Sequence, residues 1–421
     1  MLEAQPLQSN DAHKFLPLLI KTSFTPLVHR VDSCFYCNTS VRLTVRYRIL
    51  VLAVCVGVVL LTGCFGDEGR RSSPFEVPVA YPAGKKPVTL VAYDVNADGY
   101  PDLLTPNAEG DTLRYFEGLG DGSFKDPVVM KTGREPLALE VNDFNGDGIG
   151  DIAVCNYGDD DLLIIEGQKD GMFVTKGRFK TGRLPIAIDS ADFNNDGIVD
   201  LAVSLRFDKL VIHLGVGDGS FKLGEAYKAT GTPAKLVTGD FNNDGNVDIA
   251  IASNAVKADF IKVYLGNGDG TLEPGRRFTG GKQSNYIAAH DVNLDGNLDI
   301  LIVSPLADSV TLFLNDGKGN FSPQPDLAGE KGPQYVAQGE FTDDKIPDLI
   351  ISNKRDNSIS ILEGRGDGTF LFPHFNFPVG PGPRALTVAD FNNDGLHDLA
   401  LVLYQREMIE VLIRSRTAPG N

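Results

Sequence analysis

The 421-residue sequence contains no tryptophan and only five cysteines. Cys34, Cys37, Cys55 and Cys64 lie near the N-terminus, so Cys155 stands alone in the long remainder of the chain. That remainder cannot form an internal disulfide, which excludes the disulfide-stapled class of small extracellular domains. Cys34 and Cys37 form a CxxC without a second pair, and we interpret them as incidental rather than as a zinc or redox site. We expect Cys155, on a strand, to be a buried free thiol.

Lys and Arg residues are also few compared with Asp and Glu residues. The sequence has 39 Lys and Arg against 56 Asp and Glu, a net charge of -17 and a pI near 4.8. Nucleic-acid binding needs a concentrated excess of Lys and Arg, so we expect no nucleic-acid partner. The 46 glycines and 24 prolines favour many short strands and tight turns over a helical bundle.

The apolar run from Ile49 to about Thr62 is shorter than the roughly 20 residues that a membrane-spanning helix needs. It follows arginines and ends in small residues, in RYRILVLAVCVGVVLLTGC at 46–64, which is the order of a secretory signal. A permanent anchor helix is the less favoured alternative. The last four residues of that stretch, LTGC, resemble the lipobox of bacterial lipoproteins. The resemblance implies cleavage before Cys64, a diacylglycerol on its sulfur, and a chain tethered to the membrane by lipid.

These features predict the organisation of the chain. Some 40 residues precede the arginines of the signal, so we expect residues 1–44 to be an upstream extension outside the natural protein. Residues 45–63 would be the signal peptide, 64–74 a tether, 75–415 the repeat domain described next, and 416–421 a tail. The residue after Cys64 is Phe65 and not Asp, which favours an extracytoplasmic location at the outer membrane or cell surface.

The body of the chain repeats one nine-residue acidic motif. Its copies are DVNADGYPD, DFNGDGIGD, DFNNDGIVD, DFNNDGNVD, DVNLDGNLD, the worn EFTDDKIPD and DFNNDGLHD, beginning at residues 94, 143, 192, 240, 291, 340 and 390. A period near 50 residues is typical of propeller blades rather than of helical solenoids. We call these nine-residue segments the acidic loops and number their positions 1 to 9.

Each unit has the pattern of four short strands. Apolar runs such as DIAV and DILIVS follow the acidic loop, and a second apolar run leads into a glycine turn such as GLGDGSF. The last unit has no fourth strand, whereas residues 75–84, FEVPVAYPAG, match that slot. The sequence therefore predicts an all-β, seven-bladed β-propeller of four-stranded blades, closed by an N-terminal strand that completes the last blade.

The acidic loops have the chemistry of a calcium site. Asp or Asn at positions 1, 3 and 5, Gly at 6 and Asp at 9 place several oxygens around a hard cation. An EF-hand would need Glu at position 12, where these units have Thr, Val, Ile or Leu, so the loop connects two strands. The alternative is that the acids form Asx-turns without a metal.

The units resemble the FG-GAP and VCBS repeats, whose best-known members form the propeller of integrin α-chains. The resemblance covers residues 75–415 and implies Ca²⁺ in each complete acidic loop, about six ions. The implied ligands are Asp94, Asn96, Asp98 and Asp102; Asp143, Asn145, Asp147 and Asp151; Asp192, Asn194, Asp196 and Asp200; Asp240, Asn242, Asp244 and Asp248; Asp291, Asn293, Asp295 and Asp299; and Asp390, Asn392, Asp394 and Asp398. In the sixth copy, Glu340 to Asp348, Thr342 and Lys345 replace the amide and the glycine. We expect that site to be empty, because the Lys ammonium would compete with the metal.

No catalytic motif accompanies the repeats. The histidines are scattered and none stands with a Ser or Cys in a recognisable arrangement, so we expect a protein without enzymatic activity. The Arg365-Gly366-Asp367 tripeptide occupies a variable slot of a glycine turn, which gives little support to cell adhesion. Some calcium-dependent polysaccharide lyases use a propeller, and such a lyase is the less favoured alternative.

Alternating strands would place the acidic loops and glycine turns at one end of the ring and the other loops at the opposite end. Those other loops carry Arg134, Arg183, Arg206, Lys257, Lys282, Arg355, Arg384 and Arg406. They are either ordinary solvated charges or a face for an anionic glycan or a protein partner. We therefore expect a monomeric, lipid-anchored binding module for a glycan or protein ligand, with a structural scaffold in an envelope assembly as the alternative.

Overall fold

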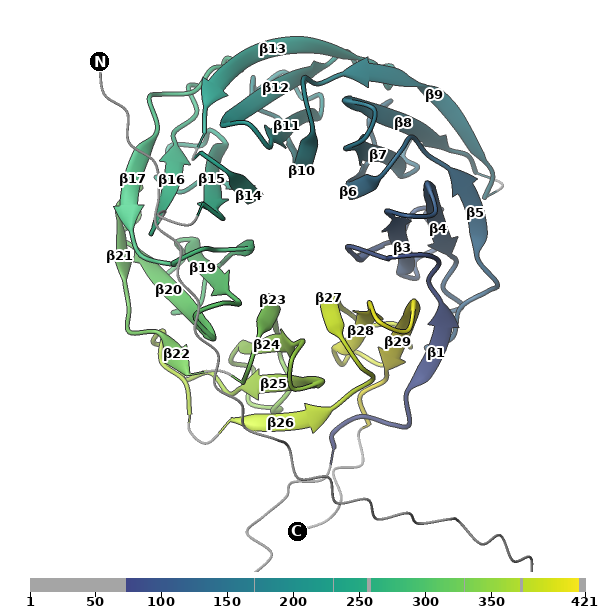
Figure 1. The fold of residues 1–421 in the computed structure, drawn as a ribbon, viewed down its shortest axis with the longest axis vertical. Coiled ribbons are helices and arrows are strands. Elements are labelled where there is room, and N and C mark those ends of the chain that lie inside the picture. The colour runs from purple at the N-terminus through teal and green to yellow at the C-terminus, as the bar shows by residue number, and fades with distance from the viewer. Residues whose placement is uncertain are drawn as a thin grey trace, which may run out of the picture. The chain divides into compact units, whose positions relative to one another are not determined.

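The computed structural model describes residues 73–169, 171–229, 231–255, 259–328, 330–371 and 374–415. The predicted extension, signal peptide, tail and lipidation residue Cys64 lie outside the described residues, as does Lys257. The described residues form seven antiparallel sheets arranged as blades in a ring (Figure 1). The prediction of an all-β, seven-bladed propeller is confirmed.

The first three blades follow the chain in simple order. The first blade comprises β2 (Val91–Tyr93), β3 (Asp102–Asn107), β4 (Thr112–Phe116) and β5 (Val128–Lys131). The second comprises β6 (Pro136–Asn142), β7 (Asp151–Asn156), β8 (Asp161–Gly167) and β9 (Phe173–Lys180). The third comprises β10 (Pro185–Ala191), β11 (Asp200–Leu205), β12 (Lys209–Gly215) and β13 (Phe221–Lys228).

The next three blades repeat this order. The fourth comprises β14 (Pro233–Gly239), β15 (Asp248–Ser253), β16 (Phe260–Tyr264) and β17 (Arg276–Thr279). The fifth comprises β18 (Tyr286–His290), β19 (Asp299–Ser304), β20 (Ser309–Asn315), β21 (Phe321–Pro323) and β22 (Leu327–Ala328). The sixth comprises β23 (Pro333–Gly339), β24 (Asp348–Asn353), β25 (Ser358–Leu362) and β26 (Phe375–Pro378). In the fifth blade the outer strand is in two pieces, because Pro323 and Pro325 cannot donate to the ladder.

The seventh blade joins both ends of the described chain. It comprises β27 (Pro383–Ala389), β28 (Asp398–Leu403), β29 (Met408–Leu412) and the N-terminal β1 (Val79–Pro82). Strand β1 pairs antiparallel with β29, with Val79 opposite Val411 and Pro82 opposite Met408. The closure predicted from residues 75–84 is thus confirmed, and β29 does not present an open edge.

Burial explains the strand pattern. The second strand of every blade is buried at all six of its residues, because neighbouring blades cover both of its faces. The outer strand β9, in contrast, is exposed or half-buried along its whole length. This difference is why the acidic loops are followed by continuous apolar runs rather than alternating ones.

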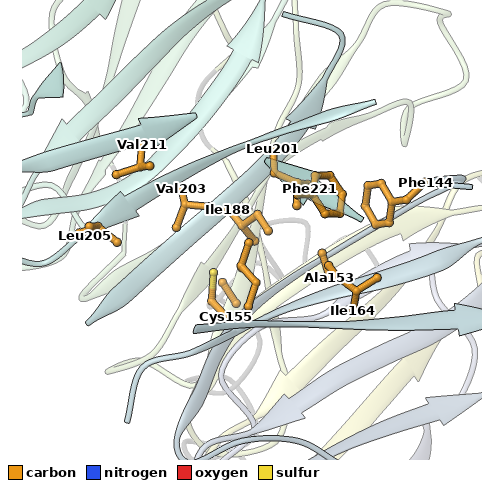
Figure 2. Close-up of a cluster of buried hydrophobic side chains, with 12 residues drawn as sticks. Phe144, Ala153, Cys155, Ile164, Ile188, Leu201, Val203, Leu205, Val211 and Phe221 are labelled. Atoms are coloured by element: carbon orange, nitrogen blue, oxygen red, sulfur yellow. The ribbon is translucent and has the colours of Figure 1, made fainter. Parts of the chain in front are cut away.

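The hydrophobic core is divided into clusters that lie between adjacent blades. One cluster joins Phe144, Cys155 and Ile164 of the second blade to Ile188 and Phe221 of the third (Figure 2). Cys155 is a fully buried free cysteine, as predicted, and burial raises the pKa of its thiol. Within the described ranges, no helix has the length and apolar character needed to cross a membrane.

Candidate functional site

The acidic loops fold around backbone N–H groups. In the first loop, the Asp98 N–H lies 3.1 Å from Asp94 Oδ1 and 3.0 Å from Asn96 Oδ1, so the two oxygens converge on one atom. Gly99 N–H donates to Asp94 Oδ2 and Tyr100 N–H to Asp98 Oδ1. The other five complete loops repeat all four bonds. Gly99 has a φ of 92°, a left-handed conformation that favours glycine at position 6.

The Asp at position 9 has a different environment. Asp102 is fully buried, and its Oδ2 accepts from Val95 N–H at 2.9 Å while its Oδ1 accepts from Gly118 N–H at 2.8 Å. It therefore fastens the acidic loop to the glycine turn of the same blade. The same pair of bonds recurs for Asp151, Asp200, Asp248, Asp299, Asp348 and Asp398. Burial raises the pKa of all seven carboxyls to about 6.

The donor chemistry of a complete loop fits calcium, because it consists of carboxylate and amide oxygens and carries three acids. Within the described ranges, however, no three Asp, Glu, His or Cys side chains are gathered into a group that could hold a metal ion. The reason lies in the hydrogen bonds: position 3 is an amide, and the acid at position 9 is turned to backbone N–H groups. The converging oxygens of positions 1, 3 and 5 are the candidate ligands. Carboxylate oxygens at position 9 keep a further acceptor site each.

The sixth loop is built around a protein cation instead. Arg414, which follows β29 and has only 4% of its surface exposed, donates from Nη1 to the Glu340 carbonyl at 2.8 Å. Its Nη2 donates to Asp343 Oδ1 at 2.7 Å, and its guanidinium lies over the Phe341 ring. We expected Lys345 to compete with a metal at this loop, and the structure places a further cation, Arg414, against it. Asp348 keeps its two backbone bonds here, so its structural role does not depend on the rest of the motif.

At the opposite end of the ring, the predicted basic residues have unequal surroundings. Arg134 pairs with Asp159 at 2.7 Å, and Arg355 forms an ion pair with Asp308. Arg183 lies over the Phe207 ring at 5.5 Å. Acids are interspersed in these loops, where they accept backbone N–H groups; Leu184, Gly231 and Gly332 donate to such acids. This end is consequently mixed in charge, with acids beside the basic residues that the sequence places there. Lys282 and Arg406 lie exposed in it.

Arg206 and Arg384 converge on the ring axis. They contribute to an axial cavity of about 410 Å³, at the end where the first strand of each blade begins. In Figure 1, β6, β10, β14, β23 and β27 lie nearest to this axis. Arg206 donates to the Tyr157 hydroxyl at 2.5 Å, and Arg384 lies 5.2 Å from the Tyr404 ring centre. Of the predicted ligand-face residues within the described ranges, these two are the ones that the cavity brings together.

Three further residues define one wall of the axial cavity. Lys235, Tyr286 and Tyr335 occupy the fifth position before the acidic loop in the fourth, fifth and sixth units, where the other units have only Thr or Ala. The Tyr286 and Tyr335 rings stack with centres 3.7 Å apart. Lys235 Nζ lies 5.5 Å and 5.6 Å from these two centres. The Tyr335 hydroxyl lies 3.1 Å from Thr89 Oγ1 of the first blade.

Two carboxylates, those of Glu140 and Asp189, lie at the third position before the acidic loop, which is two positions closer to the loop than Lys235 and the two tyrosines. Asp189 accepts from Thr238 N–H at 2.8 Å, and Glu140 occupies the equivalent position in the second blade. Burial raises the pKa of both carboxyls. Burial lowers the pKa of Lys235, but the nearby Tyr335 and the two carboxylates outweigh it and leave that pKa raised. The axial site therefore combines a cation, stacked tyrosines and carboxylates.

No motif in the sequence marks the residues of this axial site, which are Lys235, Tyr286, Tyr335, Glu140 and Asp189. The signal that could have found them is a comparison of the units at the fifth and third positions before the acidic loop. Bulky or charged residues there replace the small or aliphatic residues of the sister units.

Seven four-stranded blades, each with an acidic loop between its first and second strands, define the class of this protein: a β-propeller built from sequence repeats. A family model described as an FG-GAP-like repeat matches residues 94–154, 143–203, 192–251, 240–302, 291–351 and 340–401. These matches span more than half of the chain, which therefore belongs to the FG-GAP-like repeat family. The resemblance inferred from the acidic motif is confirmed. No relative among the curated proteins matches the sequence.

Solved structures share the propeller fold. BBS1N, in complex with ARL6DN, aligns with a TM-score of 0.61 and 14% identity over 82% of this chain and 98% of that chain. Virginiamycin B lyase from Staphylococcus aureus, in a catalytically inactive form with quinupristin, aligns with a TM-score of 0.54 and 13% identity over 80% and 99%. A functionally unknown protein from Desulfotomaculum acetoxidans aligns with a TM-score of 0.54 and 11% identity over 71% and 88%. At these identities the likeness concerns the fold.

Proposed function

We propose that the protein is a lipid-anchored binding module of the cell envelope, whose ligand docks at the ring end opposite to the acidic loops. The observation that carries this proposal is the axial cavity. Its lining includes Arg206, Lys235 and Arg384, and neither Lys235 nor Arg384 has a carboxylate at ion-pair distance among the described residues. Cations that line an opening without a direct ion pair are suited to an anionic ligand. Loops at the end of a rigid ring are common places for such recognition.

Calcium has the role of a structural ion in this proposal. Asp94, Asn96 and Asp98 would hold one ion in the first loop, and the equivalent residues would do so in the other five complete loops. A bound ion would neutralise the carboxylates at positions 1 and 5, which otherwise repel one another. The sixth loop, with Arg414 donating to its backbone and side chains, would need no ion.

The lipid anchor is proposed on Cys64 because of the LTGC sequence at the end of the signal-like segment. The expected consequence is that a Cys64→Ser variant no longer incorporates labelled fatty acid and leaves the membrane fraction. The wild-type chain should be found with the outer membrane or at the cell surface.

An acidic glycan is the favoured ligand, and a protein partner is the second candidate. The structural neighbour BBS1N was solved in complex with a protein, which supports the second candidate as a use of this fold. A scaffold in an envelope assembly would bind such a partner permanently. A lyase activity is less favoured: His213 is buried within a blade, and His397 Nδ1 accepts the Glu340 N–H at 2.9 Å, so both serve the structure.

Binding of residues 66–421 to an array of acidic and neutral glycans, in calcium and in chelator, tests the proposal. We expect acidic glycans to bind and Arg206→Gln to weaken that binding, while the melting temperature stays unchanged. A folded protein that binds no glycan, but co-purifies stoichiometrically with one envelope protein, would establish the scaffold instead.

A further inference from the structure

The axial cavity has one polar wall and one apolar wall. Lys235, Tyr286 and Tyr335 line it from three consecutive blades, while the second and third blades contribute Leu137 and Ile186. The cavity of about 410 Å³ lies between these walls at the ring axis. That volume lies within the range of roughly 300–1,000 Å³ that small-molecule sites occupy.

The cations and the carboxylates of the axial site lie at different levels along the ring axis. Arg384 and Lys235 belong to its lining, at the sixth and fifth positions before the acidic loop. Glu140 and Asp189 lie at the third position, further toward the acidic end of the ring. A ligand with two anionic groups would meet carboxylates at the deeper level. The arrangement favours a ligand with a single negative charge beside the two cations.

Apart from Arg206 and the exposed Glu135, the remaining polar groups of the lining are neutral. Asn254, Asn285 and Gln334 carry amides that both donate and accept hydrogen bonds, and Thr232 is another member of the lining. Such groups match the hydroxyls of a sugar, whereas a phosphate or sulfate would leave the amide oxygens without donors. Tyr286 and Tyr335 add an apolar surface beside them.

We propose that the axial cavity binds the terminal sugar acid of an anionic glycan, with its carboxylate between Lys235 and Arg384 and its hydroxyls toward Asn254, Asn285 and Gln334. This inference rests on the proposed glycan-binding function and names its ligand chemistry. Charge-assisted hydrogen bonds from a Lys and an Arg to one carboxylate supply the specificity. A closed ring admits a chain end more readily than the middle of a polymer.

Calorimetric titration of residues 66–421 with galacturonate, galactose and acetate tests the assignment. Galactose lacks the carboxylate, and acetate lacks the hydroxyls. We expect galacturonate to bind and the other two to bind at least tenfold more weakly. Lys235→Met and Arg384→Gln should each weaken galacturonate binding at least tenfold, and Lys235→Arg should restore most of it. Thermal melts of every variant show whether the ring is folded.

Two matched controls remove the same charges from outer strands: Lys222→Met on β13 and Arg277→Gln on β17, both exposed. Their galacturonate affinity should equal that of the wild type. Equal affinity for acetate would reduce the site to a simple anion site and overturn the assignment, as would unchanged affinity in folded Lys235→Met and Arg384→Gln variants. If acidic polymers bind but galacturonate and glucuronate do not, the cavity assignment fails while the glycan-binding function stands. If neither polymers nor sugar acids bind, both fail.

Discussion

Arg414 links the last blade to the sixth acidic loop, and its removal should destabilise the ring. Its side chain is 3% exposed and donates to the Glu340 carbonyl and to Asp343. Breaking a buried ion pair costs about 3–5 kcal/mol, but Asp343 is largely exposed, so we expect Arg414→Ala to cost about 2 kcal/mol. Denaturant midpoints measure this. Arg134→Ala removes an exposed ion pair and should leave the denaturant midpoint almost unchanged. Equal losses for the two variants would contradict a special role for Arg414.

His213 should make the ring sensitive to acid. It is 1% exposed, its Nε2 has no hydrogen-bond partner within the described part of the chain, and burial lowers its pKa to about 4. The unfolded chain takes up a proton near pH 6.5 while the folded chain does not. The stability that the neutral imidazole provides is therefore complete above pH 6.5 and is lost as the pH falls toward 4.

The test compares His213→Leu with the wild type, because Leu occupies the equivalent place in the sixth and seventh blades, at Leu362 and Leu412. From pH 7 to pH 4 the stability difference should shift in favour of the variant by about 3 kcal/mol. Other titrating groups cancel in this difference. A pH-independent difference would show that His213 has the same pKa in the folded and the unfolded chain, which would contradict the effect of its burial.

At the scale of the element, the structural role of the acid at position 9 can be measured separately from any role in metal binding. Asp348 and Asp151 make the same two backbone bonds, but only Asp151 lies in a complete loop. Asp→Asn at either position replaces one acceptor with a donor that faces an N–H group, and we expect a loss of about 2 kcal/mol. For Asp348→Asn the loss should be the same with calcium and with chelator. For Asp151→Asn it should be larger in calcium, and an equal loss in both conditions would remove Asp151 from the ligand set.

Strand β1 should be essential for a monomeric ring. Without it, β29 presents an unpaired edge that can pair with another chain. Phe75, which packs edge-on against Phe341 and Phe377, would also be lost. We expect residues 85–421 to melt earlier and to self-associate, as size-exclusion chromatography would show. A chain that begins at residue 74 is the control, and equal behaviour of the two would mean that β1 does not hold the ring closed.

The sequence predicts the strands well because the same pattern of apolar run, acidic loop and glycine turn is written seven times. Even the closing strand could be predicted, because the last unit lacks a fourth strand and residues 75–84 match the pattern of that strand. The ion-pair partners of charged side chains could not be predicted from the sequence. Arg134 and Arg355 look like free cations in the sequence, but residues about 25 and 47 positions away neutralise them. The axial cavity combines single residues from most blades, and no local pattern marks their convergence.

At the scale of the whole molecule, calcium should determine how stable the ring is. Each complete loop places three acids within nine residues, and six such loops contribute most strongly to the net charge of -17. An ion present at 100 times its dissociation constant stabilises the folded state by about 2.7 kcal/mol. Excess chelator should therefore lower the melting temperature by more than about 10 °C. Titration of the apo-protein should give about six ions, and Asp344→Asn in the sixth loop should leave that number unchanged. Asp147→Asn should reduce it by one. A melting curve that chelator does not move would mean that the loops hold their shape through hydrogen bonds alone, with Asp98 N–H and its equivalents between the oxygens of positions 1 and 3.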